Sequence, residues 1–117
     1  MEFKYKTHNN SKTRMTLSHH ILLKNPDKIP IILEKDISCT ITPIKKTKFL
    51  IGKNMTVNQF QRMIRILLKI GEEEALFLSA KGKYTIAGQK SLESIYNTYK
   101  DEDGYLYIAY STELIYG

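Results

Sequence analysis

Residues 56–70 constrain the fold of this chain more than any other segment, because they have the pattern of an amphipathic helix. Thr56 and Gln59 have the spacing of a capping box, in which the two side chains satisfy backbone amides at the start of a helix. Apolar residues then recur at helical spacing, and they are Val57, Phe60, Ile64, Leu67 and Leu68. Gly71 stands where a helix commonly stops. We therefore expect one helix here, packed through its apolar face.

Predicted strands flank this helix on both sides. Before it, residues 28–35 are rich in β-branched side chains, and a second strand at 48–51 follows a polar, threonine-rich connection. After it, the pattern predicts a short apolar strand at 75–78, a turn at 81–83, a helix at 91–99 and a strand at 105–111. The last strand alternates, so its residues divide between two faces: Leu106, Ile108 and Tyr110 on one, Tyr105, Tyr107 and Ala109 on the other.

Two prolines constrain the helix and the strand that are predicted near the N-terminus. An apolar arc at roughly helical spacing predicts a helix over residues 10–24, and its members are Met15, Leu17, Ile21 and Leu22. Pro26 ends this helix, because proline disfavours helical geometry in the residue before it. Pro30 lies inside the strand predicted at 28–35 and has no amide to donate to a sheet. We therefore expect Pro30 at an outward or irregular position.

The predicted elements follow the order of a ubiquitin-like β-grasp. This is an α+β fold in which one helix packs across a four-stranded mixed sheet, and here a helical extension precedes it. The 117 residues fit a single domain. Within it we expect an N-terminal helical extension at 1–25, a β-grasp core at 28–111 and a C-terminal tail at 112–117.

Positive charge is concentrated in the first half of the chain. Residues 1–53 hold eleven Lys and Arg against four Asp and Glu, whereas residues 54–117 hold seven against eight. The first half therefore carries +7 and the second −1. Such an excess favours partners with acidic groups, whether nucleic acid, an anionic membrane or an acidic peptide segment.

The sequence also limits the compartment. Cys39 is the only cysteine, so an internal disulfide and a four-cysteine zinc site are both excluded. No stretch approaches the roughly 18 consecutive apolar residues of a transmembrane helix, and the first six residues lack the apolar core of a secretory signal. We therefore expect a cytoplasmic protein.

Four blocks of the sequence carry a family resemblance, and they are residues 26–35, 48–50, 55–60 and 100–111. Together they resemble the autophagy-related ubiquitin-like modifiers, the family of GABARAP and autophagy-related protein eight. The resemblance implies a ubiquitin-like fold preceded by helical structure, in agreement with the order of predicted elements. The family pattern differs at residues 79–87, which lie outside the peptide groove that the family implies.

The resemblance implies conjugation through a terminal glycine, which Gly117 matches. An activating enzyme would adenylate its carboxyl group, a conjugating enzyme would carry it as a thioester, and phosphatidylethanolamine would receive it as an amide. Glycine suits this chemistry because it has no side chain to obstruct a narrow enzyme channel. A processing or deconjugating cysteine protease is a further expected partner, and Gly117 is either encoded last or exposed by processing. When lipidated, the protein would lie on autophagosomal or related membranes.

The resemblance also implies a groove for peptides with an aromatic residue and, three positions later, an aliphatic one. An extended peptide would add to the strand edge at 48–51, where main-chain hydrogen bonds give affinity and two pockets give specificity. The aromatic pocket is matched by Ile21, Pro30, Lys48, Leu50 and Tyr105, and the aliphatic pocket by Phe49, Ile51, Met55, Val57, Phe60 and Met63. Lys28, Lys46 and Arg65, together with Lys48, match cations that meet acidic residues beside the motif. The expected partners are cargo receptors and adaptors.

The residues themselves support part of this groove. Phe49 and Leu50 are adjacent in a predicted strand and must point to opposite faces, so at least one of them lies outside the main core. An exposed apolar residue beside an open edge is a docking feature. The opposing interpretation is that this residue covers a helix flank or simply lies exposed.

Enzymatic chemistry has little support, so we expect no catalytic residue, no metal and no cofactor. His19 and His20 are adjacent and point apart on a helix, and the sequence places no histidine beside Cys39. The carboxylates at 72–74 have the pattern of a solvated turn. Two nonenzymatic hypotheses stay open beside the modifier: an unconjugated docking module of the same fold, and a basic nucleic-acid-binding protein in which Phe3 and Tyr5 stack on bases. The family blocks favour the modifier, with no nucleic acid as partner.

Overall fold

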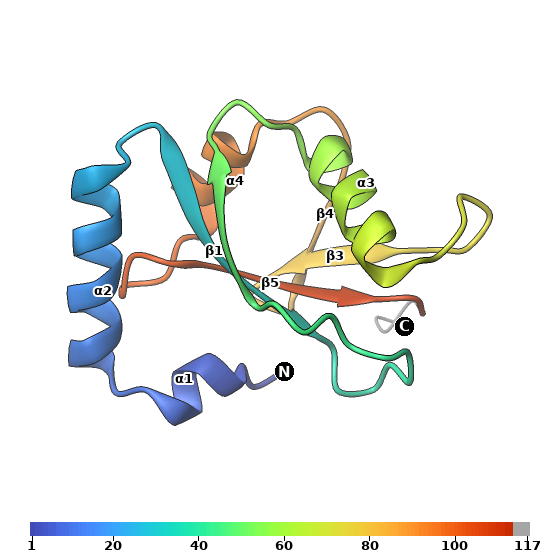
Figure 1. Ribbon diagram of the computed structural model, residues 1–117, viewed down its shortest axis with the longest axis horizontal. Coiled ribbons are helices and arrows are strands. Elements are labelled where there is room, and N and C mark those ends of the chain that lie inside the picture. The colour runs from blue at the N-terminus through green and yellow to red at the C-terminus, as the bar shows by residue number, and fades with distance from the viewer. Residues whose placement is uncertain (114–117) are drawn as a thin grey trace.

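The structure is a computed structural model that describes residues 1–113 (Figure 1). Within this part the helices are α1 (Lys4–His8), α2 (Ser11–Lys24), α3 (Val57–Leu68) and α4 (Leu92–Tyr99). The strands are β1 (Lys28–Lys35), β2 (Lys48–Gly52), β3 (Phe77–Ala80), β4 (Tyr84–Ile86) and β5 (Leu106–Ser111). None of the helices in the described part has the length and apolar character needed to cross a membrane.

The strands form one mixed sheet in the order β2-β1-β5-β3-β4. β1 and β5 are parallel neighbours, and all other pairs are antiparallel. The predicted α+β class and mixed sheet are confirmed, but the predicted number of four strands is wrong. β4 forms directly after the turn predicted at 81–83, in a segment where no strand was predicted, because Lys81 and Gly82 adopt positive φ angles of 59° and 71° and turn the chain back along β3. A strand of three residues is too short to show a period of its own.

Two apolar clusters lie on opposite faces of the sheet. Figure 1 shows the matching arrangement of helices, with α3 and α4 above the sheet and α1 below it. The larger cluster packs α3 and α4 against one face and contains Ile31, Leu33, Leu106 and Ile108. The smaller cluster lies on the side of α1 and α2, and its buried members are Phe3, Tyr5, Ile32, Tyr105, Tyr107 and Ala109. The predicted alternation of the last strand is therefore confirmed, with each set of residues in its own cluster.

The central helix α3 confirms the strongest local prediction. Thr56 caps it, and both reciprocal hydrogen bonds of the capping box with Gln59 are present. The helix ends at Leu68, before the predicted stop at Gly71, and the capping residue Lys69 adopts the left-handed conformation with φ 59°. Leu67, which was predicted on the buried face, is instead exposed.

The helix predicted over residues 10–24 is confirmed as α2, and the side chain of Asn10 accepts the amide of Thr13. Its predicted apolar arc is only partly correct. Ile21 is half-buried against the smaller cluster, but Met15 and Leu17 are exposed. Ser18 is buried instead and donates to the Asp103 carbonyl. The contact of Ser18 with Asp103, which lies far from α2 in the sequence, therefore helps to decide which face of α2 is buried.

Pro30 lies in the regular, buried part of β1, which differs from the predicted outward or irregular position. The Leu33 amide donates to the Thr47 carbonyl, on the β2 side of the strand. Because amides alternate between the two sides of a strand, the ring nitrogen of Pro30 faces β5. The register between β1 and β5 begins only at Ile31, so the missing amide costs the sheet no hydrogen bond.

Candidate functional site

The outer side of β2 is an open edge of the sheet. The Leu33 amide donates to the Thr47 carbonyl. Every second residue pair of an antiparallel ladder is hydrogen-bonded, so the pairs of Phe49 with Ile31 and of Ile51 with Ile29 are hydrogen-bonded as well. The amides and carbonyls of Lys48 and Leu50 therefore point away from β1. An edge with free donors and acceptors can receive an extended segment as an additional strand.

The residues predicted for the aromatic pocket lie together on the side of α1 and α2. Leu50 is 38% exposed and stands opposite Pro30 in the register. Lys48 shares this face because it is two residues from Leu50 in the same strand. Ile21 reaches it from α2, and Tyr105 belongs to the same buried cluster. The structure therefore gathers residues from α2, β1, β2 and the start of β5 at one edge.

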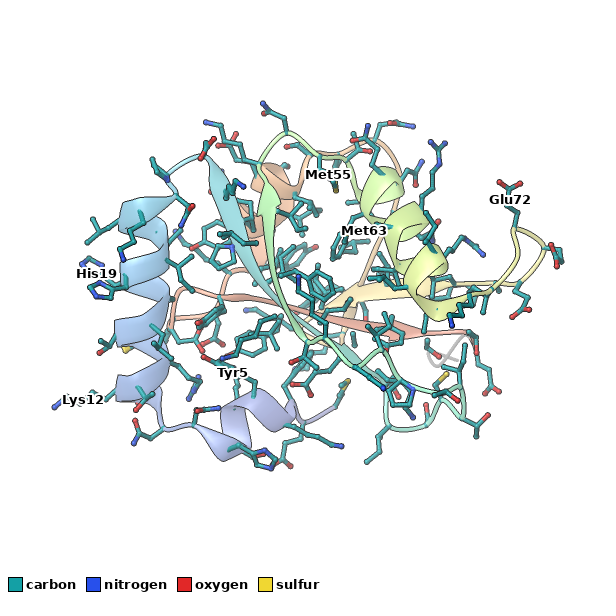
Figure 2. All side chains as sticks on the ribbon, viewed as in Figure 1. Tyr5, Lys12, His19, Met55, Met63 and Glu72 are labelled. Carbon is teal, nitrogen blue, oxygen red and sulfur yellow. The ribbon has the colours of Figure 1, made fainter. Side chains whose placement is uncertain are left out.

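The residues predicted for the aliphatic pocket lie on the opposite face, in and around the larger cluster. Phe49, Ile51, Val57 and Phe60 are buried there. Met55 and Met63 are only partly buried and pack against the cluster, and Figure 2 shows them near the N-terminal end and along the side of α3. The two methionines are thus the members with surface available to a ligand. Methionine suits such a place, because its flexible, polarisable side chain adapts to irregular partners.

The predicted basic contacts take three different positions. The ammonium nitrogen of Lys46 lies 4.8 Å from the centre of the Phe49 ring, at the start of β2. Lys28 is aligned with Gly52 at the other end of that strand. The Arg65 guanidinium donates to the carbonyls of Gly71 and Glu74, at 2.8 and 2.6 Å, and so holds the loop that follows α3.

A buried polar network anchors the N-terminal helices to the sheet, and sequence reasoning missed it. Asp103 accepts from the Arg14 guanidinium at 2.6 Å and from the Tyr107 hydroxyl at 2.5 Å. Burial and the hydrogen bond to Asp103 raise the pKa of Tyr107 well above its usual value. Burial raises the pKa of the Asp101 carboxyl, but the Lys6 ammonium and neighbouring donors outweigh it and hold that pKa below its usual value. The signal available in the sequence was only a run of acidic residues before a tyrosine-rich strand.

The short helix α1 depends on this anchoring. It has five residues and no side-chain cap of its own, and within the helical extension expected at 1–25 the sequence pattern located a helix only over residues 10–24. Instead the Glu34 carboxylate of β1 accepts the amides of Lys4 and Tyr5, at 2.7 and 3.0 Å. Phe3 and Tyr5 are buried as a result, which contradicts the hypothesis that these two rings stack on nucleic-acid bases.

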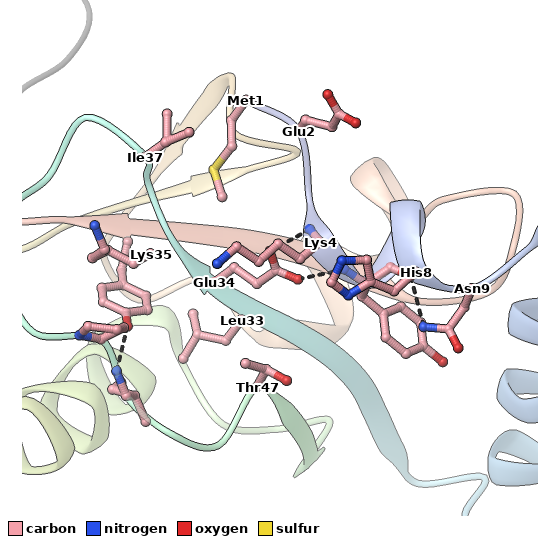
Figure 3. A pocket seen from close by; sticks show the side chains of 14 residues that line it. Met1, Glu2, Lys4, His8, Asn9, Leu33, Glu34, Lys35, Ile37 and Thr47 are labelled. Atoms are coloured by element: carbon pink, nitrogen blue, oxygen red, sulfur yellow. Dashed lines mark hydrogen bonds between the residues drawn. The ribbon is translucent and has the colours of Figure 1, made fainter.

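A hollow of about 410 Å³ lies between α1, the end of β1 and the loop before β2 (Figure 3). Leu33, Ile37 and Ile44 supply apolar lining, and Lys4 and Glu34 lie along it. The Glu34 carboxylate is already occupied by the amides of α1. Because Tyr5 and Thr47 also line this hollow, it adjoins the start of the β2 edge.

The remaining candidates lie apart from this edge. His19 points away from the sheet on α2 (Figure 2), and Cys39 is buried. Burial raises the pKa of the Cys39 thiol, but hydrogen bonds from Thr112 and its neighbours outweigh burial and lower it. Across residues 1–113, no three His, Cys, Asp or Glu side chains gather as a metal site would require. Gly117, predicted as the conjugation site, lies outside the described residues.

Comparisons with known proteins agree on one group of relatives. A family model described as "Autophagy protein Atg8 ubiquitin like" matches residues 13–117. Autophagy-related protein 8a of Arabidopsis thaliana is 40% identical over 114 residues, which cover 97% of this chain and 92% of the relative. Autophagy-related protein 8 of Mycosarcoma maydis is 35% identical over 117 residues, covering 100% and 98% of the two chains. The crystal structure of Trypanosoma brucei ATG8 superposes with a TM-score of 0.90 at 32% identity and covers both chains completely.

Proposed function

The chain belongs to the Atg8 family of ubiquitin-like autophagy proteins, and on this basis we propose that it is a membrane-conjugated modifier that recruits partners through the β2 edge. Family membership confirms the resemblance and the ubiquitin-like fold. Membership supports the membrane and lipidation part of the proposal, and the geometry of the edge supports the recruiting part.

Gly117 is the proposed site of conjugation. ATP converts its carboxylate to an acyl-adenylate and releases pyrophosphate, and a cysteine thiol of the activating enzyme then displaces AMP. The acyl group passes to a thiol of the conjugating enzyme. The amine of phosphatidylethanolamine finally attacks the thioester carbonyl, forms the amide and releases that thiol. This sequence needs only a terminal glycine on the modifier and no catalytic residue of its own.

The β2 edge is the proposed peptide site, and one observation carries this proposal. Leu50 is exposed at the edge of the sheet, and its amide and carbonyl point away from β1. Pro30 and Ile21 lie on one face of this edge, and Met55 and Met63 lie on the other. Added main-chain hydrogen bonds give affinity, and an aromatic and an aliphatic side chain three positions apart fill the two faces. Lys46, which precedes β2, and Lys48, its first residue, favour acidic residues beside the motif.

The two activities support each other on a membrane. Conjugation would place many copies of the β2 edge on one surface, where a cargo receptor or adaptor with repeated motifs meets a raised effective concentration. Membrane-bound copies on autophagosomal or related membranes would then retain partners that a single soluble copy releases. An activating enzyme, a conjugating enzyme and a deconjugating cysteine protease complete the proposed set of partners.

Reconstitution tests the proposal directly. The protein is incubated with cognate activating and conjugating enzymes, ATP and phosphatidylethanolamine liposomes, and its intact mass is measured. We expect a mass increase of one lipid that maps to Gly117. If no thioester or adduct forms while an aromatic-x-x-aliphatic peptide still binds, the protein is an unconjugated docking module.

A further inference from the structure

Tyr5 of α1 contacts two residues that are predicted for the aromatic pocket, although the family resemblance does not place Tyr5 there. Its ring packs edge-on against Tyr105, with centroids 5.2 Å apart and planes at 74°. Its hydroxyl donates to the Tyr105 hydroxyl at 3.2 Å. The ammonium nitrogen of Lys48 lies 5.0 Å from the centre of the Tyr5 ring. One side chain therefore connects α1 to both the cation and the aromatic ring of the pocket.

The position of Tyr5 is set by contacts that fasten α1 to the sheet. Figure 2 shows Tyr5 between α1 and the sheet, and Figure 3 shows Glu34 bonded to the start of this helix. Lys6 forms an ion pair with Asp101, and the Phe3 ring packs on Tyr107 with centroids 5.1 Å apart. A helix of five residues has little stability of its own, so these contacts, rather than helix propensity, hold Tyr5 in place.

We propose that Tyr5 is a positioning residue of the peptide site that acts through Lys48, an inference that rests on the proposed peptide groove. An ammonium group is attracted to the face of an aromatic ring. Lys48 is exposed at a strand edge, and a contact with Tyr5 restricts the rotamers of its long side chain. A lysine that is already ordered loses less entropy when it binds a carboxylate. The favoured partner is thus a peptide with acidic residues beside its aromatic anchor.

The ring and the hydroxyl of Tyr5 have separable effects. The ring holds Lys48, whereas the hydroxyl fixes the orientation of Tyr105. Tyr5→Phe removes only the hydroxyl. Tyr5→Leu also removes the aromatic face, while it keeps an apolar side chain within the buried cluster. The two variants therefore distinguish a role through Lys48 from a role through Tyr105.

The test compares two peptides with the same aromatic-x-x-aliphatic motif, one with two Glu beside the aromatic residue and one with two Gln. Dissociation constants are measured for the full chain by fluorescence polarisation. Tyr5→Leu is expected to raise the dissociation constant of the acidic peptide about threefold to tenfold and that of the neutral peptide about twofold or less. Tyr5→Phe is expected to keep the preference for the acidic peptide. Tyr84→Leu is the matched control, because Tyr84 stacks on Tyr99 at the opposite edge of the sheet, and both affinities should stay unchanged.

A double-mutant cycle separates positioning from general support of the fold. With Lys48→Ala already present, Tyr5→Leu is expected to weaken the binding of both peptides by the same factor, because the ring then has no ammonium group to hold. Equal losses for both peptides with Lys48 intact would overturn the proposal. A second measurement does not depend on affinity: ring currents should shift the Lys48 side-chain proton resonances in the wild type and in Tyr5→Phe, but not in Tyr5→Leu. Unshifted resonances in the wild type would also overturn it.

Leu50→Asp distinguishes failure of this inference from failure of the groove. If the wild type binds neither peptide, or if Leu50→Asp binds both as well as the wild type, the proposed groove is wrong and the role of Tyr5 in it is wrong too. If the wild type binds and Leu50→Asp does not, while Tyr5→Leu keeps its full preference for the acidic peptide, only the inference about Tyr5 is overturned.

Discussion

Replacing Arg14 with methionine is expected to lower the free energy of unfolding by about 3 kcal/mol. The Arg14 guanidinium lies 2.6 Å from the Asp103 carboxylate, and their side chains are 13% and 2% exposed. Breaking a buried pair by removing one partner costs about 3–5 kcal/mol, because it leaves an uncompensated charge. Asp103 would keep the Tyr107 hydroxyl and the Tyr105 amide as donors, which places the cost near the lower end of that range. The methionine preserves most of the apolar stem of the side chain.

Urea unfolding followed by circular dichroism measures this change. With a urea dependence of about 1–3 kcal/mol per molar, the midpoint should fall by about 1–3 M at unchanged slope. Lys53→Met is the matched control: Lys53 pairs with Glu93 at 3.8 Å, both side chains are 40% exposed or more, and its loss should cost about 0.5 kcal/mol or less. An Arg14→Met midpoint indistinguishable from that of Lys53→Met would refute the argument that burial makes this pair important.

Three further predictions concern function, acid stability and the core. Leu50→Ala is expected to weaken peptide binding without preventing lipid conjugation and Gly117→Ala to do the reverse, as measured by peptide titration and intact mass; loss of both activities in either folded variant would contradict this separation. The folded-state pKa of Asp101 is depressed, so its pairing with Lys6 stabilises the fold fully above the usual carboxyl pKa of about 4, and this stabilisation is lost as pH falls through the depressed pKa. In urea unfolding, the stability difference between wild type and Asp101→Asn should therefore shrink towards low pH, and a difference that stays constant from pH 7 to 2 would refute this prediction. Ile64→Ala removes a side chain with 0% exposure beneath α3 and should cost about 2–5 kcal/mol in the same assay, whereas a cost below 1 kcal/mol would mean that the helix packs more loosely than the structure indicates.

Local patterns predicted the elements that carry their own signals. The capping residues and apolar period of α3, and the alternation of Leu106 and Tyr107 in β5, depend only on neighbours in sequence, and the structure confirms both. The same local reasoning failed for Leu67 and for Met15, which have the right spacing but are exposed in the described part of the chain. Spacing defines a face of a helix, whereas burial of that face needs a partner.

The elements that sequence reasoning missed are held by distant residues. α1 begins where the Glu34 carboxylate accepts its first amides, 30 and 29 residues away from Lys4 and Tyr5. β4 exists because β3 offers it an edge. Neither segment has enough residues to show a period, so no pattern within them could have predicted their structure.

The candidate site divides in the same way. Its residues were recognisable from the sequence blocks, and strand alternation alone predicts that Phe49 and Leu50 point to opposite faces. Only the strand order, with β2 at the edge, decides that the backbone of Leu50 meets an open side, and only the docking of α1 brings Tyr5 to Lys48. Alternation and capping are local consequences of backbone geometry, which the sequence determines by itself. The open edge of β2 and the contact of Tyr5 with Lys48 depend on residues that are far apart in the chain, so the tertiary structure alone decides them.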